Sequence, residues 1–307
     1  MHGDIVGQDP RLRKDLAEAC DGRGLHASRV GVPGVIRPAR RPSGWVPPGP
    51  LPAGAGDRAD LAPQADEDLC YLSGEWRVFQ KLHGHRWSLD DLVTAWVAAR
   101  HLGGAAQALD LGCGLGSVLL MVAWKAQQTR VTGVEAQPER ASMARRSIAF
   151  NGVEARCEVL DGDLRSLDLG PNFALVTGTP PYFPRGTGTE AEADHVSACR
   201  FEHRGGVEAY LTAAERHVSA DGVFVMCAAT LEDDRVRAMA SPLHARGLLH
   251  VVPREGKAPL VSVWTFTRSP GLCAHEALVV RDTKGQWTPA FQNVRSEMGL
   301  PPTPPRR

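Results

Sequence analysis

The sequence has no excess of charge of either sign, because 35 lysines and arginines balance 35 aspartates and glutamates. The molecule as a whole therefore attracts no polyanion strongly, and a nucleic-acid partner would have to be held by a local basic patch. Long apolar runs are also missing: none approaches the length of a membrane span, and the first residues contain no secretory signal. We expect a soluble, cytoplasmic protein with no membrane partner.

Paired cysteine motifs are absent too. The seven cysteines are scattered, odd in number and include no C-x-x-C, which indicates reduced thiols rather than a disulfide framework. His195, Cys199 and His203 follow one another at intervals of four residues. A fourth ligand is not evident and the spacing matches no common zinc pattern, so we expect no metal site.

Residues 1–66 are rich in proline, glycine and arginine and show no sustained helical or strand period. This composition predicts a mostly disordered extension. Its basic cluster of Arg37, Arg40 and Arg41 could contact RNA, although a solvated tail is the simpler interpretation. We expect a folded domain over residues 67–300, followed by a disordered tail, 301–307.

Within this domain, strand and helix patterns alternate along the chain. Alternation of this kind favours a parallel sheet with helices on both faces. A hairpin is expected near the end, where two apolar runs flank a loop that contains glycine. The sequence predicts strands at 107–112, 130–136, 157–164, 173–178 and 222–229, helices at 90–102, 117–127, 138–152 and 206–219, and the hairpin at 248–268.

A glycine-rich loop, ALDLGCGLGS, joins the first of these strands to its helix. Gly112, Gly114 and Gly116 would let the backbone approach a ligand closely at a helix N-terminus. Dinucleotide-binding enzymes have a glycine loop too, but the spacing here is G-x-G-x-G, and Asp110 would repel a pyrophosphate. A cationic ligand that carries an amino acid would tolerate this carboxylate or use it.

Two more acids follow the next two strands. Glu135 lies about twenty residues past the loop, where a carboxylate can accept hydrogen bonds from both hydroxyls of a ribose. Asp163 is placed to accept a hydrogen bond from an adenine amino group. Each acid alone could be a surface or capping residue, but three at successive strand ends beside a glycine loop are an improbable coincidence.

The motifs DLGCGLG, VEA, GDL and TPPYF together resemble the class I S-adenosylmethionine-dependent methyltransferases. More narrowly, they resemble the bacterial enzymes that methylate adenine N6 in valine tRNA and have a small methyltransferase domain. The resemblance implies a Rossmann-like α/β fold with a seven-stranded, mostly parallel sheet, an antiparallel last strand and helices on both faces. It implies S-adenosylmethionine as cofactor, held by Asp110, Gly112, Gly114, Gly116, Glu135 and Asp163.

The stretch VTGTPPYFP ends a predicted strand, because Pro180 and Pro181 have no amide hydrogen for a sheet. In the families that this chain resembles, the turn reads Asn-Pro-Pro-Tyr, with Asp or Ser also in first position. It orients a planar amine, and its aromatic ring offers a stacking face for an extruded base. The resemblance therefore assigns catalytic positions to Thr179, Pro180, Pro181 and Tyr182. A tight turn without chemistry is the alternative.

Thr179 departs from the asparagine of the family. Its hydroxyl accepts a hydrogen bond more weakly than an amide oxygen and has no second heteroatom. Either an amine is still bound, with the Pro180 carbonyl carrying more of the hydrogen bonding, or the group that accepts the methyl differs.

The polar stretch 184–206 leads from this turn to the next helix, and long connections of this kind are often functional. Arg185, Arg200 and Arg204 would make a local phosphate-contacting surface there, although a solvated loop is the alternative. Upstream, the resemblance makes Arg86, Trp87 and Asp90 candidates to close the pocket. Trp87 could equally pack in the core.

We expect methyl transfer from S-adenosylmethionine to an exocyclic amine, with adenine N6 of a tRNA as the leading acceptor and a monomer assumed. One alternative is a methyltransferase that acts on a protein side chain or small metabolite. For such an enzyme, neutralising Arg200 and Arg204 would leave turnover unchanged. The other is a non-catalytic RNA-binding or scaffold protein that retains the fold and fails to bind S-adenosylmethionine.

Overall fold

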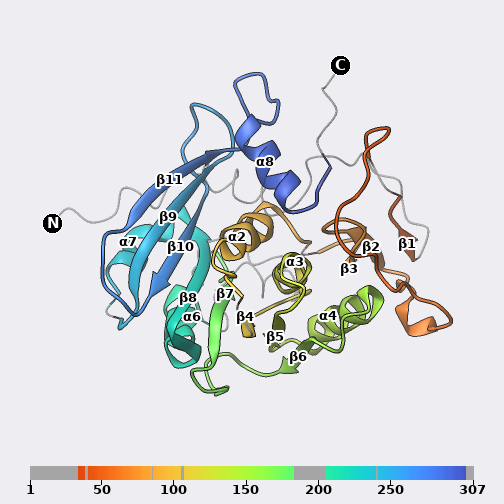
Figure 1. The fold of residues 1–307 in the computed structure, drawn as a ribbon, viewed down its shortest axis with the longest axis horizontal. Helices are drawn as coiled ribbons and strands as arrows, with labels where there is room; N and C mark the ends of the chain where they lie inside the picture. Colours follow the sequence, from red (N-terminus) through yellow and green to blue (C-terminus); the bar gives the residue numbers. More distant parts are fainter. Residues whose placement is uncertain are drawn as a thin grey trace.

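The computed structural model describes residues 34–38, 41–84, 86–104, 107–182, 205–239 and 241–301. Within these ranges, eight strands form a large sheet, and three further strands form a small sheet near one end of it (Figure 1). None of the helices described is both long and apolar enough to span a bilayer.

The large sheet is mostly parallel. Its strands are β4 (Gln107–Leu111), β5 (Arg130–Glu135), β6 (Cys157–Asp161), β7 (Phe173–Gly178), β8 (Val218–Ala229), β9 (His244–Val252), β10 (Val261–Thr267) and β11 (Ala274–Val279). They lie in the order β11-β9-β10-β8-β7-β4-β5-β6, and only β10 runs antiparallel to its neighbours. The predicted parallel strands and the β9–β10 hairpin are therefore confirmed.

Helices cover both faces of this sheet (Figure 1). They are α2 (Leu89–Ala99), α3 (Ser117–Lys125), α4 (Pro138–Asn151), α6 (Val207–His217), α7 (Asp233–Arg237) and α8 (Pro289–Glu297), with short 3-10 turns η2 (Ala59–Leu61) and η3 (Thr230–Glu232). In β4, Ala108 belongs to the core with α2, α3, α4 and α8, whereas Leu109 and Leu111 belong to the core with α6 and α7. Burial on both faces explains the nearly continuous apolar sequences of the parallel strands.

The sheet has eight strands where the family resemblance implied seven. The additional strand, β11, pairs in parallel with β9 at the edge of the sheet, so the antiparallel strand β10 is not the last strand of the chain. Four of the six residues of β11 are exposed and only Leu278 is buried. An edge strand with so little buried surface has no apolar pattern that sequence analysis can detect.

The small sheet consists of β1 (Val35–Ile36), β2 (Glu67–Tyr71) and β3 (Arg77–Lys81), and it lies against α4. The hydroxyl of Ser147 on α4 accepts a hydrogen bond from the Phe79 amide at 3.0 Å. The Asn151 side chain accepts one from the Arg77 amide at 2.9 Å. These two polar side chains tie β3 to the helix that follows β5.

The described residues upstream of 67 contact the domain at several points. Arg37 forms an ion pair with the buried Asp68 at 2.7 Å, and Arg41 pairs with Glu75. Both arginines are therefore engaged within the fold, which differs from the RNA contact or solvated tail considered above, while Arg40 lies outside the described residues. The packed part of the chain thus extends upstream of residue 67.

Candidate active site

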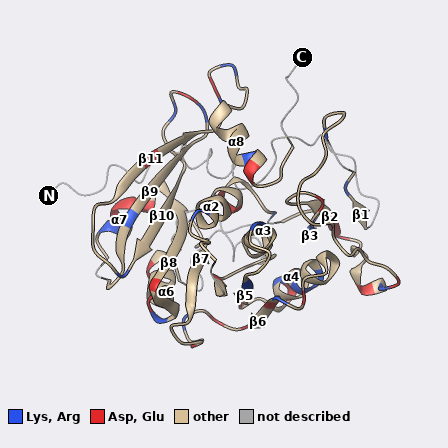
Figure 2. Ribbon diagram, viewed as in Figure 1, with Lys and Arg blue, Asp and Glu red and all other residues tan. Residues whose placement is uncertain are grey.

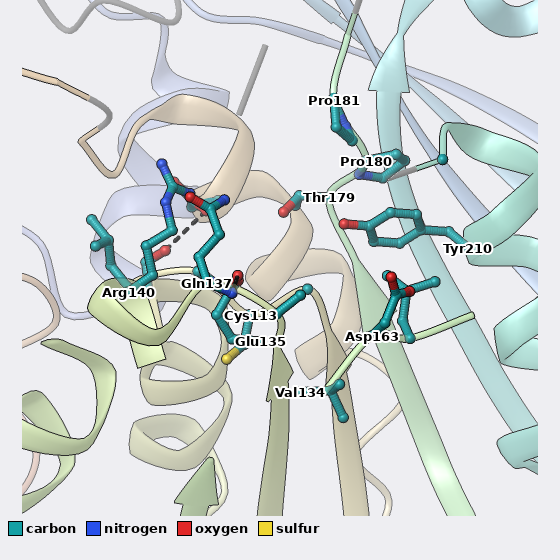
Figure 3. A pocket seen from close by; sticks show the side chains of 18 of the residues that line it. Cys113, Val134, Glu135, Gln137, Arg140, Asp163, Thr179, Pro180, Pro181 and Tyr210 are labelled. Carbon is teal, nitrogen blue, oxygen red and sulfur yellow. Dashed lines mark hydrogen bonds between the residues drawn. The ribbon is translucent and has the colours of Figure 1, made fainter. Parts of the chain in front are cut away.

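A cavity lies at the carboxyl ends of the parallel strands, where ligands bind in open α/β sheets. The glycine loop after β4, the end of β5, the segment after β6 and the double-proline turn after β7 all line it (Figure 3). The structure therefore brings together many residues that the sequence singled out. Those that line the cavity are Asp90, Gly112, Gly114, Glu135, Asp163, Thr179, Pro180, Pro181 and Tyr182.

The glycine loop bends sharply because Gly112, Gly114 and Gly116 all adopt left-handed backbone conformations, with φ of 62°, 57° and 79°. A Cβ atom at Gly112 would lie 2.2 Å from the Tyr210 hydroxyl, so only glycine fits there. A Cβ at Gly114 would meet its nearest atom, Nη1 of Arg140, at an ordinary contact distance of 3.7 Å, so at this position the left-handed backbone rather than crowding favours glycine. Gly116 does not line the cavity and instead begins α3.

Asp110 lies beneath the loop and does not line the cavity, so the structure does not place it toward a ligand. Its carboxylate accepts hydrogen bonds from the Leu119 amide at 3.2 Å and from the Thr177 hydroxyl at 2.8 Å. Burial raises the pKa of Asp110 to about 7. Gly116 has no side chain to cap α3, and Asp110 supplies the missing acceptor for its first turn.

Glu135 ends β5 and is almost fully buried. One carboxylate oxygen accepts a hydrogen bond from the Gly114 amide at 2.9 Å, and the other accepts one from the Gln137 amide at 2.7 Å. The carboxylate thus fixes both the glycine loop and the entrance to α4. Because a carboxylate has about four lone-pair sites, two remain for a bound ligand.

Asp163 lies across the cavity from the glycine loop (Figure 3). It accepts hydrogen bonds from the backbone amide and from the guanidinium of Arg165, the latter at 2.9 and 2.6 Å. The side chain is 27% exposed, so it is accessible from the cavity even though it is paired.

The double-proline turn directs Thr179 into the cavity, where its hydroxyl group points toward the centre (Figure 3). The Tyr182 side chain is not the free stacking face for a base that we expected. Its hydroxyl donates to the Asp90 carboxylate, it lies 3.6 Å from the Cys227 thiol, and only 8% of the residue is exposed. Tyr182 therefore joins the turn to α2.

The three residues considered for pocket closure lie in different places. Asp90 lines the cavity. Arg86 forms an ion pair with Asp68 at 2.8 Å, and Trp87 packs against the core. Arg185, Arg200 and Arg204, like His195, Cys199 and His203, lie outside the described residues.

Sequence reasoning missed several residues that line the cavity, among them Asp91, Arg140 and Tyr210. Asp91 accepts hydrogen bonds from the Ser88 amide at 2.8 Å and the Ser117 hydroxyl at 2.9 Å. Burial, followed by repulsion from Asp90, raises the pKa of Asp91. The capping-box spacing from Ser88 to Asp91 was visible in the sequence, but Arg140 and Tyr210 carry no local motif.

The residue types around the cavity fit S-adenosylmethionine. Carboxylates at Asp90 and Glu135 suit the positive charges of its sulfonium and ammonium groups, and the Arg140 guanidinium suits its carboxylate. The Arg140 guanidinium lies beside the glycine loop, with its Nη1 atom 3.7 Å from the position of a Cβ added at Gly114. When bound, this cofactor supplies an electrophilic methyl group.

Comparison with known proteins agrees with this site. A methyltransferase domain model matches residues 108–185, which span the glycine loop and the double-proline turn. A tRNA1(Val) (adenine(37)-N6)-methyltransferase of Tolumonas auensis is 26% identical over 214 residues, covering 68% of this chain and 87% of that protein. The enzyme of the same name from Yersinia pestis is 27% identical over 214 residues, covering 68% and 84%.

The fold has a counterpart among solved structures. The crystal structure of a predicted O-methyltransferase from Agrobacterium tumefaciens superposes with a TM-score of 0.51 at 20% identity, covering 68% of this chain and 98% of that one. The sheet order, the cavity at its carboxyl edge and the matched domain agree on one assignment. The chain is an S-adenosylmethionine-dependent methyltransferase with a class I, Rossmann-like fold.

Proposed function

We propose that this enzyme methylates an exocyclic amine, and that the amine is adenine N6 of a tRNA. One observation carries the proposal: Thr179 and Pro180 open into the same cavity as the glycine loop and Glu135. Acceptor and methyl group can therefore meet there. The names of the relatives from Tolumonas auensis and Yersinia pestis support tRNA adenine as the acceptor.

In this proposal the glycine loop holds the methionine portion of the cofactor, Glu135 accepts hydrogen bonds from its ribose, and Asp163 accepts one from its adenine. The lone pairs that Glu135 retains beside its two backbone contacts support this role.

The acceptor side of the proposal rests on orientation. The Thr179 hydroxyl and a backbone carbonyl of the turn accept hydrogen bonds from the two hydrogens of a planar amine, which directs the nitrogen lone pair into the cavity. The prolines hold these acceptors rigid, so little conformational entropy is lost when the amine binds. No dedicated base is needed, because the proton leaves after the nitrogen has become cationic.

The proposal also requires a surface that contacts the phosphates of the RNA. On the described elements, basic and acidic side chains are interspersed in the view of Figure 2, for example along α4 and α7. We assign phosphate contact to Arg185, Arg200 and Arg204, which lie outside the described residues.

Labelled S-adenosylmethionine incubated with separate pools of tRNA, ribosomal RNA, DNA and protein tests the proposal. We expect label in the tRNA pool, recovered as N6-methyladenosine after digestion. Label in the protein pool alone would contradict the proposal and favour the alternative that Thr179 raises, an acceptor other than a nucleobase amine. The Thr179→Asn variant refines the result, since it should keep or increase the activity on an amine.

A further inference from the structure

Tyr210 belongs to none of the sequence motifs, yet its side chain crosses the floor of the cavity from α6. A Cβ atom at Gly178, the last residue of β7, would lie 2.6 Å from its ring. A Cβ atom at Gly112, just after β4, would lie 2.2 Å from its hydroxyl. Two glycines, one at the end of β7 and one just after β4, thus make room for one phenol.

The hydroxyl of Tyr210 is directed into the cavity, on the same side as the Thr179 hydroxyl (Figure 3). Only 6% of the residue is exposed, although the cavity reaches it. A phenol that merely filled the core between β4 and β7 would not need its polar end in the cavity, because phenylalanine has the same ring.

Burial, together with the nearby carboxylates of Glu135 and Asp110, raises the pKa of the Tyr210 hydroxyl. The phenol therefore stays neutral over the working pH range. A neutral phenol oxygen both donates and accepts hydrogen bonds, whereas it is a poor proton acceptor in catalysis. Its chemistry at this position is that of a fixed hydrogen-bonding group.

We propose that the Tyr210 hydroxyl contacts the acceptor amine and accepts one of its hydrogen bonds, which compensates for the weaker acceptor that Thr179 offers in place of an asparagine amide oxygen. This refines the arrangement proposed above, in which the turn accepts both amine hydrogens: the turn keeps one hydrogen, and Tyr210 accepts the other. This inference rests on the proposed function, since it assumes a planar amine in the cavity. It explains how the turn can carry threonine and still orient a planar amine for methylation.

Tyr210→Phe is the direct test, because it removes only the hydroxyl. Tyr71→Phe is the matched control: Tyr71 lies on β2 between the guanidinium groups of Arg41 and Arg77, at 4.5 and 3.5 Å, and does not line the cavity. Kinetics are measured on a tRNA(Val) transcript. We expect Tyr210→Phe to lower kcat and kcat/KM about tenfold, which is typical of one hydrogen bond made in the transition state, and Tyr71→Phe to match wild type.

Two readouts separate this role from a structural one. Calorimetry with S-adenosylhomocysteine should give Tyr210→Phe a Kd within about twofold of wild type, because a contact to the acceptor does not alter cofactor affinity. Thr179→Asn should raise kcat several-fold more in the Tyr210→Phe background than in wild type, since the stronger amide acceptor matters more once the Tyr210 hydroxyl is lost. A Kd that rises tenfold, or equal effects of Thr179→Asn in both backgrounds, would overturn the inference.

The two proposals fail differently. If wild type methylates the transcript and Tyr210→Phe does so equally well, only the role of Tyr210 is wrong. If wild type binds S-adenosylhomocysteine but leaves the transcript unmethylated, the proposed function is wrong and the inference falls with it.

Discussion

Glu135 connects two parts of the site, the glycine loop and the start of α4, through a single carboxylate. Its oxygens hold the Gly114 amide at 2.9 Å and the Gln137 amide at 2.7 Å, so it fixes the glycine loop relative to α4. In the proposed function, ligand binding at this carboxylate would use a group that the backbone has already oriented. Preorganisation of this kind avoids an entropy cost when the ligand binds.

The Glu135→Ala variant should weaken cofactor binding strongly. It removes a charged acceptor from the ribose and also releases two backbone amides of the site, so we expect Kd for S-adenosylmethionine to rise by about thirtyfold, equivalent to about 2 kcal/mol. Calorimetry measures this directly. Glu158→Ala is the control, because Glu158 lies exposed on the next strand and does not line the cavity. An unchanged Kd in Glu135→Ala would show that Glu135 does not hold the cofactor.

At the scale of elements, Asp110 anchors α3 from the end of β4. Its carboxylate meets the Leu119 amide in the first turn of the helix, at the N-terminus where the helix dipole favours negative charge. Burial nevertheless raises its pKa to about 7. An unfolded chain would give this group a pKa of about 4.

Asp110→Asn should change how stability depends on pH. In wild type the folded state holds the Asp110 proton more tightly than the unfolded state, so the stability that this group contributes is fully present below pH ~4 and is lost as pH rises through ~7. Asparagine keeps a carbonyl oxygen for Leu119 and an amide for Thr177, whose own hydroxyl reaches the Leu109 carbonyl at 3.4 Å. We expect the unfolding free energy of the variant to gain a few kcal/mol on wild type between pH 4 and 8.

Calorimetric unfolding of both proteins across this range provides the measurement. Asp221→Asn, at an exposed position on β8, is the control and should show a constant difference. If the Asp110→Asn difference is also constant with pH, the buried carboxyl does not titrate as argued.

Elements with strong local patterns were predictable from the sequence. The predicted helix at 138–152 corresponds to α4 (Pro138–Asn151), because proline at its start and Asn-Gly at its end mark its limits. The small sheet was not predicted. In β2, Glu67 and Asp68 are buried because arginines from distant segments neutralise them, and no local pattern announces such pairs.

In the site, too, residues with a local sequence pattern were predicted and residues placed by tertiary packing were not. Glu135 and Thr179 were found because each directly follows or ends a predicted strand, so topology alone brings them to one edge. Tyr210 was missed because its position depends on how α6 packs across Gly112 and Gly178. Asp110 was assigned to the ligand because the sequence does not distinguish an acid beneath the loop from one above it.

At the scale of the whole molecule, the small sheet and the segment before it join the catalytic domain through Arg146 on α4. This guanidinium pairs with Glu67 at 2.8 Å and donates to the carbonyls of Asp60 and Ala62 at 2.8 and 2.7 Å. The side chain of Glu67 is only 2% exposed. The same helix begins at the Glu135–Gln137 contact, so the upstream segment and the cofactor site share one support.

Arg146→Ala should therefore destabilise the entire protein rather than loosen a tail. It leaves the Glu67 carboxylate buried without its partner, which typically costs about 3–5 kcal/mol. The neighbouring Arg145 is the matched control, because it also donates to a backbone carbonyl, that of Val159, but its charged partner Asp161 is 62% exposed and an exposed pair contributes about 1 kcal/mol or less. Thermal unfolding of the two alanine variants compares them directly, and we expect a much larger fall in Tm for Arg146→Ala. Equal falls would mean that the segment upstream of β2 contributes little to the stability of the domain.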